Sequence, residues 1–171
     1  MMHVLLYLLI IIITFFCLTL IGHLVHYSLH QKWMGQFHKS HMVHHLELYP
    51  SYDYFSDKYR SAGKHSTFVF FLPLALIFLG IPLTLYFLGI IPLWFSVLLF
   101  LEILIVSYAH DYIHDAFHIR GHFLNKNQYF RELSFLHYVH HVDMSKNFGI
   151  YLFLWDRLFK SYQIYTTLTK K

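Results

Sequence analysis

Three long apolar stretches dominate the pattern of hydrophobic and polar positions along the chain. They run from about 4 to 25, from about 67 to 88 and from about 91 to 109, and Glu102 is the one charged residue among them. A run of about 20 apolar residues is long enough to cross a bilayer as a helix. Proline and glycine interrupt the second stretch, so both a complete span and a re-entrant one fit it. The pattern predicts an all-α, membrane-embedded helical bundle.

Composition supports a membrane protein. Hydrophobic residues make up 57% of the chain and charged residues 13%, against about 45–50% and about 25% in soluble domains. The length of 171 residues predicts a single domain over 1–171. The first stretch lacks a basic segment before it and is longer than the core of a signal peptide, so we interpret it as a retained anchor. The single Cys17 forms no disulfide within the chain.

The positions of the charges predict the topology. Only Gly89 and Ile90 separate the second and third stretches, which therefore form a tight hairpin that returns the chain to one side of the membrane. Segments 26–66 and 110–171 then share a face. All 13 Lys and Arg residues lie within these two segments, and the positive-inside rule assigns them to the cytoplasm, for a bacterial inner membrane and for the endoplasmic reticulum alike. The basic residues form no dense patch, which argues against nucleic-acid binding.

Histidines carry the candidate chemistry. Seven of the 16 lie between 23 and 45 and seven between 110 and 141, and in each cluster an HxxxH motif is followed by HxxHH. Residues three or four apart share a helix face, so each motif is expected to point its imidazoles in one direction. Ten rings suit two metal ions with five nitrogen ligands each. These ten residues are His26, His30, His41, His44, His45, His110, His114, His137, His140 and His141.

The third motif belongs to a ladder in which four histidines follow one another at intervals of four residues, from His110 to His122. Each step turns about 40° around a helix, so one straight helix does not aim all four at one centre. The pair His110 and His114 is favoured, with His118 as an additional candidate ligand. His122 is expected at the surface or behind the ligands.

Two further histidines, His23 and His38, are alternative ligands in a register shifted by three residues. Metal-bound imidazoles usually donate their second N–H to a carboxylate or a carbonyl. Carboxylates near the motifs are candidates for this role, and a carboxylate inside a span is a candidate for substrate binding or proton transfer. These acidic residues are Asp111, Asp115, Asp143 and, inside the span, Glu102.

The order of the four motifs resembles that of the fatty acid hydroxylase and sterol desaturase superfamily of membrane di-iron oxygenases. The resemblance extends from about 23 to 162 and includes the segments Asn147-Phe148-Gly149-Ile150-Tyr151 and Trp155-Asp156-Arg157-Leu158-Phe159. The segments Phe37-His38-Lys39-Ser40-His41 and Tyr129-Phe130-Arg131 are similar to the β-carotene hydroxylase branch.

The resemblance implies an enzyme that hydroxylates or desaturates a C–H bond of a lipid. Its cofactors would be two iron ions, which zinc can replace during purification, and its co-substrate would be O2. Electrons would come from a separate donor of the ferredoxin, cytochrome b5 or reductase type. A fatty acid or a sterol-like lipid is the favoured substrate, and hydroxylation of a carotenoid ring is the alternative.

A function of another class also fits the histidine spacing, namely a membrane protein that binds metal without catalysis. A transporter is expected to place polar ligands near the middle of its spans, and here Glu102 is alone there. This argues against transport and leaves a zinc-stabilised scaffold as the non-enzymatic alternative.

Overall fold

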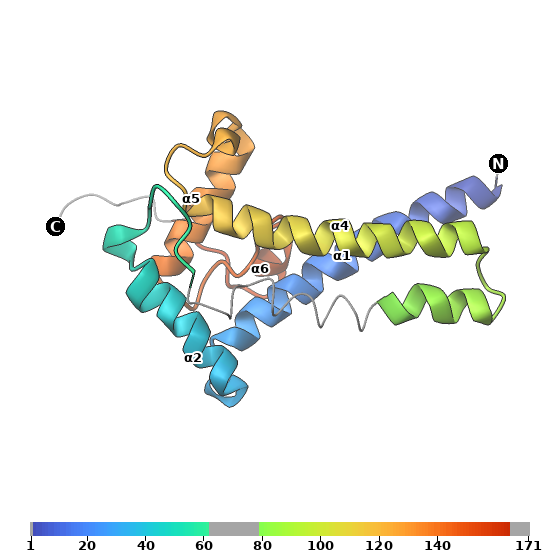
Figure 1. Ribbon diagram of the computed structural model, residues 1–171, viewed down its shortest axis with the longest axis horizontal. Helices are drawn as coiled ribbons and strands as arrows, with labels where there is room; N and C mark the ends of the chain where they lie inside the picture. The colour runs from blue at the N-terminus through green and yellow to red at the C-terminus, as the bar shows by residue number, and fades with distance from the viewer. Residues whose placement is uncertain (1, 62–78, 165–171) are drawn as a thin grey trace.

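A computed structural model describes residues 2–61 and 79–164, with side chains from residue 4 onward. The described parts are helical, with one isolated bridge between Ser56 and Ile119 and no strand. Figure 1 shows a long arm of helices and, at its end, a head in which shorter helices gather. The predicted all-α class is confirmed.

The helix α1 (Met2–Leu29) forms one side of the arm. Its 28 residues span about 42 Å, more than the roughly 30 Å of a bilayer core. Leucine and isoleucine side chains are exposed all along it, among them Leu5, Leu9 and Ile12. An exposed helix that is apolar on every side is typical of contact with lipid. By length and composition, Val4–Leu29 and Leu93–Phe117 are each able to cross a membrane.

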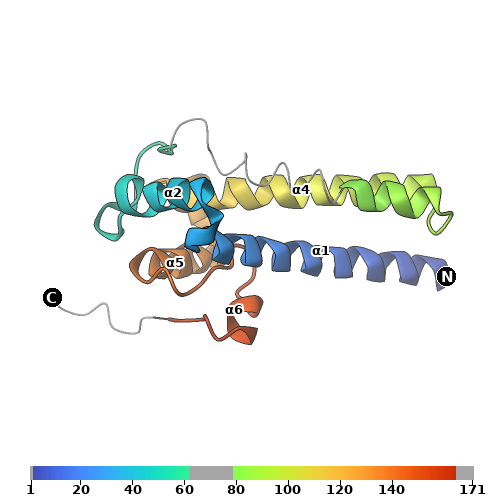
Figure 2. The same ribbon diagram turned by 90° about the horizontal axis from the view of Figure 1, so that it is seen from below.

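The predicted hairpin lies at the far end of the arm. A helix over 79–87 leads into a turn at Gly89, whose φ of +70° favours glycine, and α4 (Leu93–Phe117) returns toward the head. Figure 2 shows α4 and α1 side by side along the arm. The helix α4 continues past 109, where the third apolar stretch was expected to end, and its last turns carry His110 and His114. Residues 67–78 of the second stretch lie outside the described residues.

The two long helices approach each other closely near the head. A Cβ placed on Gly22 would lie 3.1 Å from Nε2 of His110, so a side chain there would press on the opposite helix. At the other end of the arm, the ring of Tyr7 lies against Trp94 and Phe95, with centroids 5.0 and 4.4 Å away. These contacts set the relative position of α1 and α4, and therefore of the histidines at their head ends.

The head consists of short helices around a small apolar core. The helix α5 begins after Asn127, whose side-chain oxygen accepts a hydrogen bond from Phe130 N–H and so caps the helix. The core joins the end of α4 to α5 and to the segment before α6, through Phe117, Phe130 and Phe153. The elements of the head are η1 (Lys32–Met34), α2 (Gln36–Val43), the π-helix η2 (His44–Leu48), η3 (Ser51–Asp53), η4 (Phe123–Lys126), α5 (Gln128–Val142) and α6 (Leu154–Leu158).

Candidate metal centre

Two groups of histidines lie where the arm meets the head. The candidate ligand atoms of each group fall within 4.8 Å of one another. The first histidine group consists of His26, His30, His41, His45 and His140. The second histidine group consists of His44, His114, His118 and His137. A further residue, His141, lies close to His44 and His45 and therefore between the groups.

The two groups draw on the sequence motifs in the same way. Each contains one complete HxxxH pair, His26 and His30 in the first group and His114 and His118 in the second. Each HxxHH motif was expected to point all its rings in one direction. Instead, the rings of each motif divide between the two groups. From η2 and the preceding helix, His41 and His45 enter the first group and His44 the second.

Helical geometry explains this division. Residues i and i+4 lie about 40° apart around an α-helix, whereas the histidine before i+4 lies about 100° from it. The first and last rings of an HxxHH motif therefore share a direction that the middle ring leaves. In α5 the same rule separates His140, in the first group, from His137 in the second. The π-helical turn after His44 adds a bulge of the kind often found at functional sites.

Nitrogen atoms crowd together inside the first group. The Nε2 atoms of His30 and His140 lie 3.0 Å apart, those of His41 and His30 3.0 Å, and those of His45 and His41 3.1 Å. A neutral imidazole nitrogen either donates one hydrogen or accepts, so three successive contacts in a row do not all form hydrogen bonds. Ligands about 2.1 Å from one ion and at right angles lie about 3.0 Å apart. The three separations are therefore of the size expected for ligands of one shared metal ion.

Backbone carbonyls orient four of the rings. In the first group, the Nδ1–H of His26 donates to Phe148 O (2.8 Å) and that of His140 to Lys146 O (2.6 Å). A carbonyl only accepts, so each neutral ring carries its proton on Nδ1 and presents the Nε2 lone pair to the centre. Metal-binding histidines are commonly held in this way.

The same arrangement recurs beside the second group. The Nδ1–H of His118 donates to Tyr54 O (3.2 Å) and that of His141 to Tyr49 O (2.7 Å). Both Nε2 atoms are buried without a hydrogen-bond partner among the described residues. Buried polar atoms are normally paired, so these two lone pairs fit metal binding.

Burial keeps these imidazoles neutral. Outside the long helices, removal from water lowers the pKa of His30 from 6.5 to about 2, and the neighbouring imidazoles His26 and His38 lower it further. Burial first, and neighbouring histidines second, also hold the pKa of seven other rings well below the usual range. They are His41, His44, His45, His118, His137, His140 and His141. A neutral ring is the form that binds a metal.

Among the ladder residues, the structure brings His114 and His118 into the second group and leaves His110 and His122 outside both groups. His110 lies against Gly22 and, 3.7 Å away, the carboxylate of Asp111. His122 caps η4 through Leu124 N–H and contacts the hydroxyl of Tyr112.

The two alternative ligands of the first cluster also lie outside the groups. The Nδ1–H of His38 donates to Leu29 O over 2.9 Å. His23 faces the buried carboxylate of Asp156, with Nδ1 3.5 Å from Oδ2, and stacks on Phe159. His38 therefore contacts the backbone at the end of α1, and His23 contacts side chains beside the centre.

The four acidic candidates occupy different positions. Asp115 lies 3.6 Å from Nδ1 of His114 and Asp111 beside His110, as expected for carboxylates behind imidazoles. Asp143 instead accepts hydrogen bonds from the backbone and hydroxyl of Ser145. Glu102 is half-buried on α4, and its Oε2 has no hydrogen-bond partner in the described parts of the chain.

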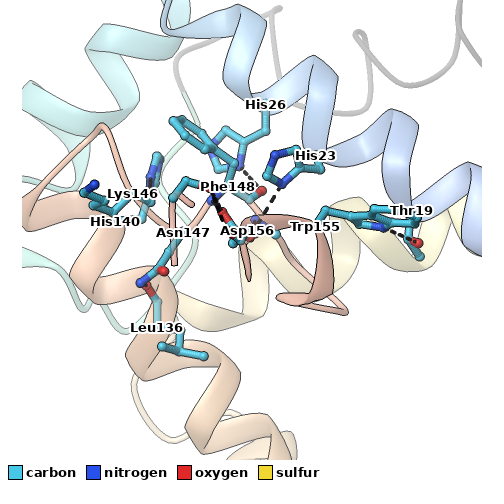
Figure 3. A network of polar contacts seen from close by, with 12 residues as sticks. Thr19, His23, His26, Leu136, His140, Lys146, Asn147, Phe148, Trp155 and Asp156 are labelled. Atoms are coloured by element: carbon cyan, nitrogen blue, oxygen red, sulfur yellow. Dashed lines mark hydrogen bonds and ion pairs between the residues drawn. The ribbon is translucent and has the colours of Figure 1, made fainter. Parts of the chain in front are cut away.

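Residues 146–149, together with Asp156, were not identified as site residues from the sequence. The carbonyls of Phe148 and Lys146 orient His26 and His140, and the side chain of Asp156 accepts hydrogen bonds from the same turn (Figure 3). A backbone carbonyl accepts a hydrogen bond whatever side chain its residue carries, so the residue type does not reveal the contact. The available signal was the pair of segments 147–151 and 155–159, which carry the family resemblance.

Fold and site together define a class of protein, a helical membrane-type protein with a paired histidine metal centre. The chain belongs to the fatty acid hydroxylase family, whose pattern it matches over residues 11–161. The predicted superfamily is thereby confirmed. This family consists of metal-dependent, oxygenase-type enzymes that act on lipids in membranes. No curated protein and no solved structure gives a significant match to the chain.

Proposed function

We propose that the protein is a di-iron oxygenase that hydroxylates or desaturates a C–H bond of a membrane lipid. The observation that carries the proposal is that ten histidines, nine of them buried, divide into two sets of equal make-up once His141 is assigned to the second. Each set combines an HxxxH pair, two outer rings of one HxxHH motif and the middle ring of the other. In this proposal His141 completes the second set, because it shares a helix direction with His137. Its ring lies 4.1 Å from that of His45, 4.8 Å from that of His118 and 4.9 Å from that of His137.

The donor set suits iron. Imidazole nitrogen binds iron, zinc, copper and nickel, and neutral rings held by carbonyls supply lone pairs without the negative charge that thiolates or carboxylates add. When bound, two iron ions supply the redox chemistry that activates O2. In hydroxylation, a lipid C–H, O2, two electrons and two protons give a lipid C–OH and one water, so the enzyme needs an external reductant.

The position of the centre suits a substrate that comes from the bilayer. The histidines of α1 and α4 lie at the head end of helices whose other side chains are largely apolar and exposed. An acyl or sterol-like chain in the membrane reaches the head by moving along these helices. A fatty acid or a sterol-like lipid is the proposed substrate, and a carotenoid ring is the alternative that the same entry route permits.

The head faces the cytoplasm in this proposal, and the arm crosses the membrane more than once. Neither α1 nor α4 contains Lys or Arg, whereas the head contains Lys32, Arg120 and Arg131 among others. This distribution follows the positive-inside rule. Electrons then arrive from the aqueous side, from a separate ferredoxin, cytochrome b5 or reductase.

Mass spectrometry of lipids from cells that express the chain tests the proposal. We expect a lipid about 16 Da heavier than its precursor after hydroxylation, or about 2 Da lighter after desaturation. The His140→Ala variant should lack the product and His122→Ala should retain it. Absence of any oxidised fatty acid, sterol or carotenoid, together with zinc in both groups after growth with ample iron, would identify a scaffold instead.

A further inference from the structure

Behind the first histidine group lies a buried carboxylate that contacts no candidate ligand of that group. Asp156, on α6, is fully buried. Its Oδ1 accepts hydrogen bonds from Phe148 N–H (2.7 Å) and the hydroxyl of Ser161 (2.7 Å), and its Oδ2 accepts one from Gly149 N–H (2.9 Å). Successive backbone N–H groups that converge on one anion form a nest. Here the anion is a side chain of the same protein.

Peptide geometry connects this carboxylate to His26. The N–H of Gly149 and the C=O of Phe148 belong to one planar trans peptide, so they point in opposite directions. Asp156 holds the N–H end, and the C=O end accepts the hydrogen bond from Nδ1–H of His26. Figure 3 shows His26, Phe148 and Asp156 in this order. Fixing the peptide plane therefore fixes the direction of the imidazole.

The peptide between Lys146 and Asn147 acts on His140 in the same way. Its C=O end, on Lys146, accepts from Nδ1–H of His140, and its N–H end, on Asn147, donates to Ser161 O (3.0 Å). Ser161 in turn donates two hydrogen bonds to Asp156. Its hydroxyl donates to the carboxylate, and its N–H donates to Asp156 O (2.9 Å). One aspartate thus anchors both carbonyls that orient first-group rings.

Two features of the turn show that it is built around this contact. Asn147 has a φ of +54°, in the left-handed region that residues other than glycine seldom adopt. Its side-chain N–H₂ group donates hydrogen bonds to Leu136 O and Gln163 O, which hold it in this conformation. A Cβ on Gly149 would lie 2.8 Å from Oδ2 of Asp156 and 2.5 Å from Leu152 O. Only glycine permits this approach of backbone to carboxylate.

We propose that Asp156 is a positioning residue for one of the two metal ions, the ion of the first histidine group. It acts through the peptides 146–147 and 148–149 and binds neither metal nor substrate. The second group takes its carbonyls from Tyr49 and Tyr54, which Asp156 does not contact, so its ion is expected to be independent of this aspartate. The inference rests on the proposed metal binding.

Replacement by asparagine tests the proposal because it keeps the shape and removes one acceptor. The amide has a single acceptor oxygen, so it leaves either Phe148 N–H or Gly149 N–H without a partner and turns an N–H₂ group toward it. Loss of partners that orient a metal-binding histidine commonly weakens binding about 10- to 100-fold. We expect the Asp156→Asn protein to release one ion about tenfold or more faster and the other at the wild-type rate.

The experiment uses the full chain in lipid nanodiscs, loaded with Co²⁺. Ions per chain, release to a chelator, and the visible spectrum of bound Co²⁺ are measured for each variant. The spectrum of the ion lost from Asp156→Asn should match that lost from His140→Ala and differ from that lost from His137→Ala. Glu132→Gln, a change at an exposed side chain that accepts a hydrogen bond from Gln128, is the matched control and should behave as wild type.

The outcomes separate the two proposals. A wild-type protein that binds no ions contradicts the proposed function. A folded Asp156→Asn protein that releases both ions equally faster, or neither, overturns the positioning role. If Asp156→Asn does not fold, Ser161→Ala decides the question, because it removes one donor to the carboxylate and keeps both backbone contacts. It should accelerate release of the same single ion by a smaller factor, and equal or absent effects overturn the proposal.

Discussion

The two histidine groups are alike in composition and different in what holds them. Each has an HxxxH pair at the end of one long helix. His26 and His114 are the pair members within α1 and α4, and His30 and His118 are the residues that follow these helices. With His141 counted in the second group, as proposed, each also has two rings whose Nδ1–H donates to backbone carbonyls. For the first group these carbonyls lie in the turn at 146–148, and for the second in the loop at 49–54.

The two supporting segments are stabilised by different interactions. The 146–148 turn is fixed by the buried carboxylate of Asp156. The 49–54 loop is fixed mainly by aromatic packing, since Tyr49 is fully buried and stacks on His118 at 4.0 Å. Its polar contacts include those of Arg60, which donates to Leu48 O and pairs with Asp53, and the Tyr54 hydroxyl, which donates to Ser134 O. Equivalent metal sites can thus be separated by mutation, because different distant segments orient them.

Loss of a ring from either group should have the largest effect. His140→Ala and His137→Ala should each abolish lipid oxidation, because catalysis by two metal ions needs both. Each variant should retain one ion per chain, and the remaining ions should differ in their spectra. Metal analysis with Co²⁺ spectroscopy makes the measurement. If both variants lost both ions, the groups would be one cooperative site and the comparison would fail.

A second test concerns the choice between His118 and His110 as a ligand of the second ion. His118→Ala should remove that ion and the activity. His110→Ala should retain two ions and lower the free energy of unfolding by about 1–3 kcal/mol, the usual effect of a cavity at a helix contact. Metal content and chemical denaturation are measured on both. Loss of metal from His110→Ala with full retention in His118→Ala would reverse the assignment.

Acid should affect both groups together. Burial lowers the pKa of His30 from 6.5 to about 2, and burial lowers the pKa of seven other head histidines in both groups. Below pH 6.5 the unfolded chain takes up protons that the folded centre excludes, so the stability of the metal-free protein falls as pH decreases. Each such histidine contributes a slope of about 1.4 kcal/mol per pH unit.

Denaturation of the metal-free protein between about pH 8 and 5 measures this dependence, where the ordinary histidine titrates. Stability should be nearly constant above pH 6.5, the unperturbed value, and fall below it. Stability that stays level or increases on acidification would mean that the imidazoles are charged in the folded protein. Such a result would contradict neutral, metal-ready rings.

The smallest effect is expected from Arg60→Ala. The guanidinium is partly exposed and its partner Asp53 is exposed, and ion pairs at the surface contribute little. Release of the second ion should accelerate no more than about fivefold, and release of the first should not change. Chelator kinetics provide the measurement. An effect as large as that of Asp156→Asn on the first ion would show that polar contacts, and not aromatic packing, hold the 49–54 loop.

Some of the fold was predictable because its causes are local. Long apolar stretches predict the helices of the arm, and the change from apolar to histidine-rich sequence predicts where the head begins. The third apolar stretch was expected to cross the membrane from about 91 to 109, with histidines at helical spacing after it. They continue the same helix to Phe117, since histidine is tolerated in a helix and no Pro or Gly intervenes.

The sequence by itself determined the class of protein, the long helices and the histidines from which a metal centre is built. It did not determine which histidines share an ion. Helical spacing gives the relative directions of rings on one helix, but His26 and His140 come from different helices and meet only through packing. The role of Asp156 depends on tertiary structure for the same reason. Its hydrogen bonds go to backbone atoms, and their directions exist only once the turn at 146–149 is folded against α1 and α5.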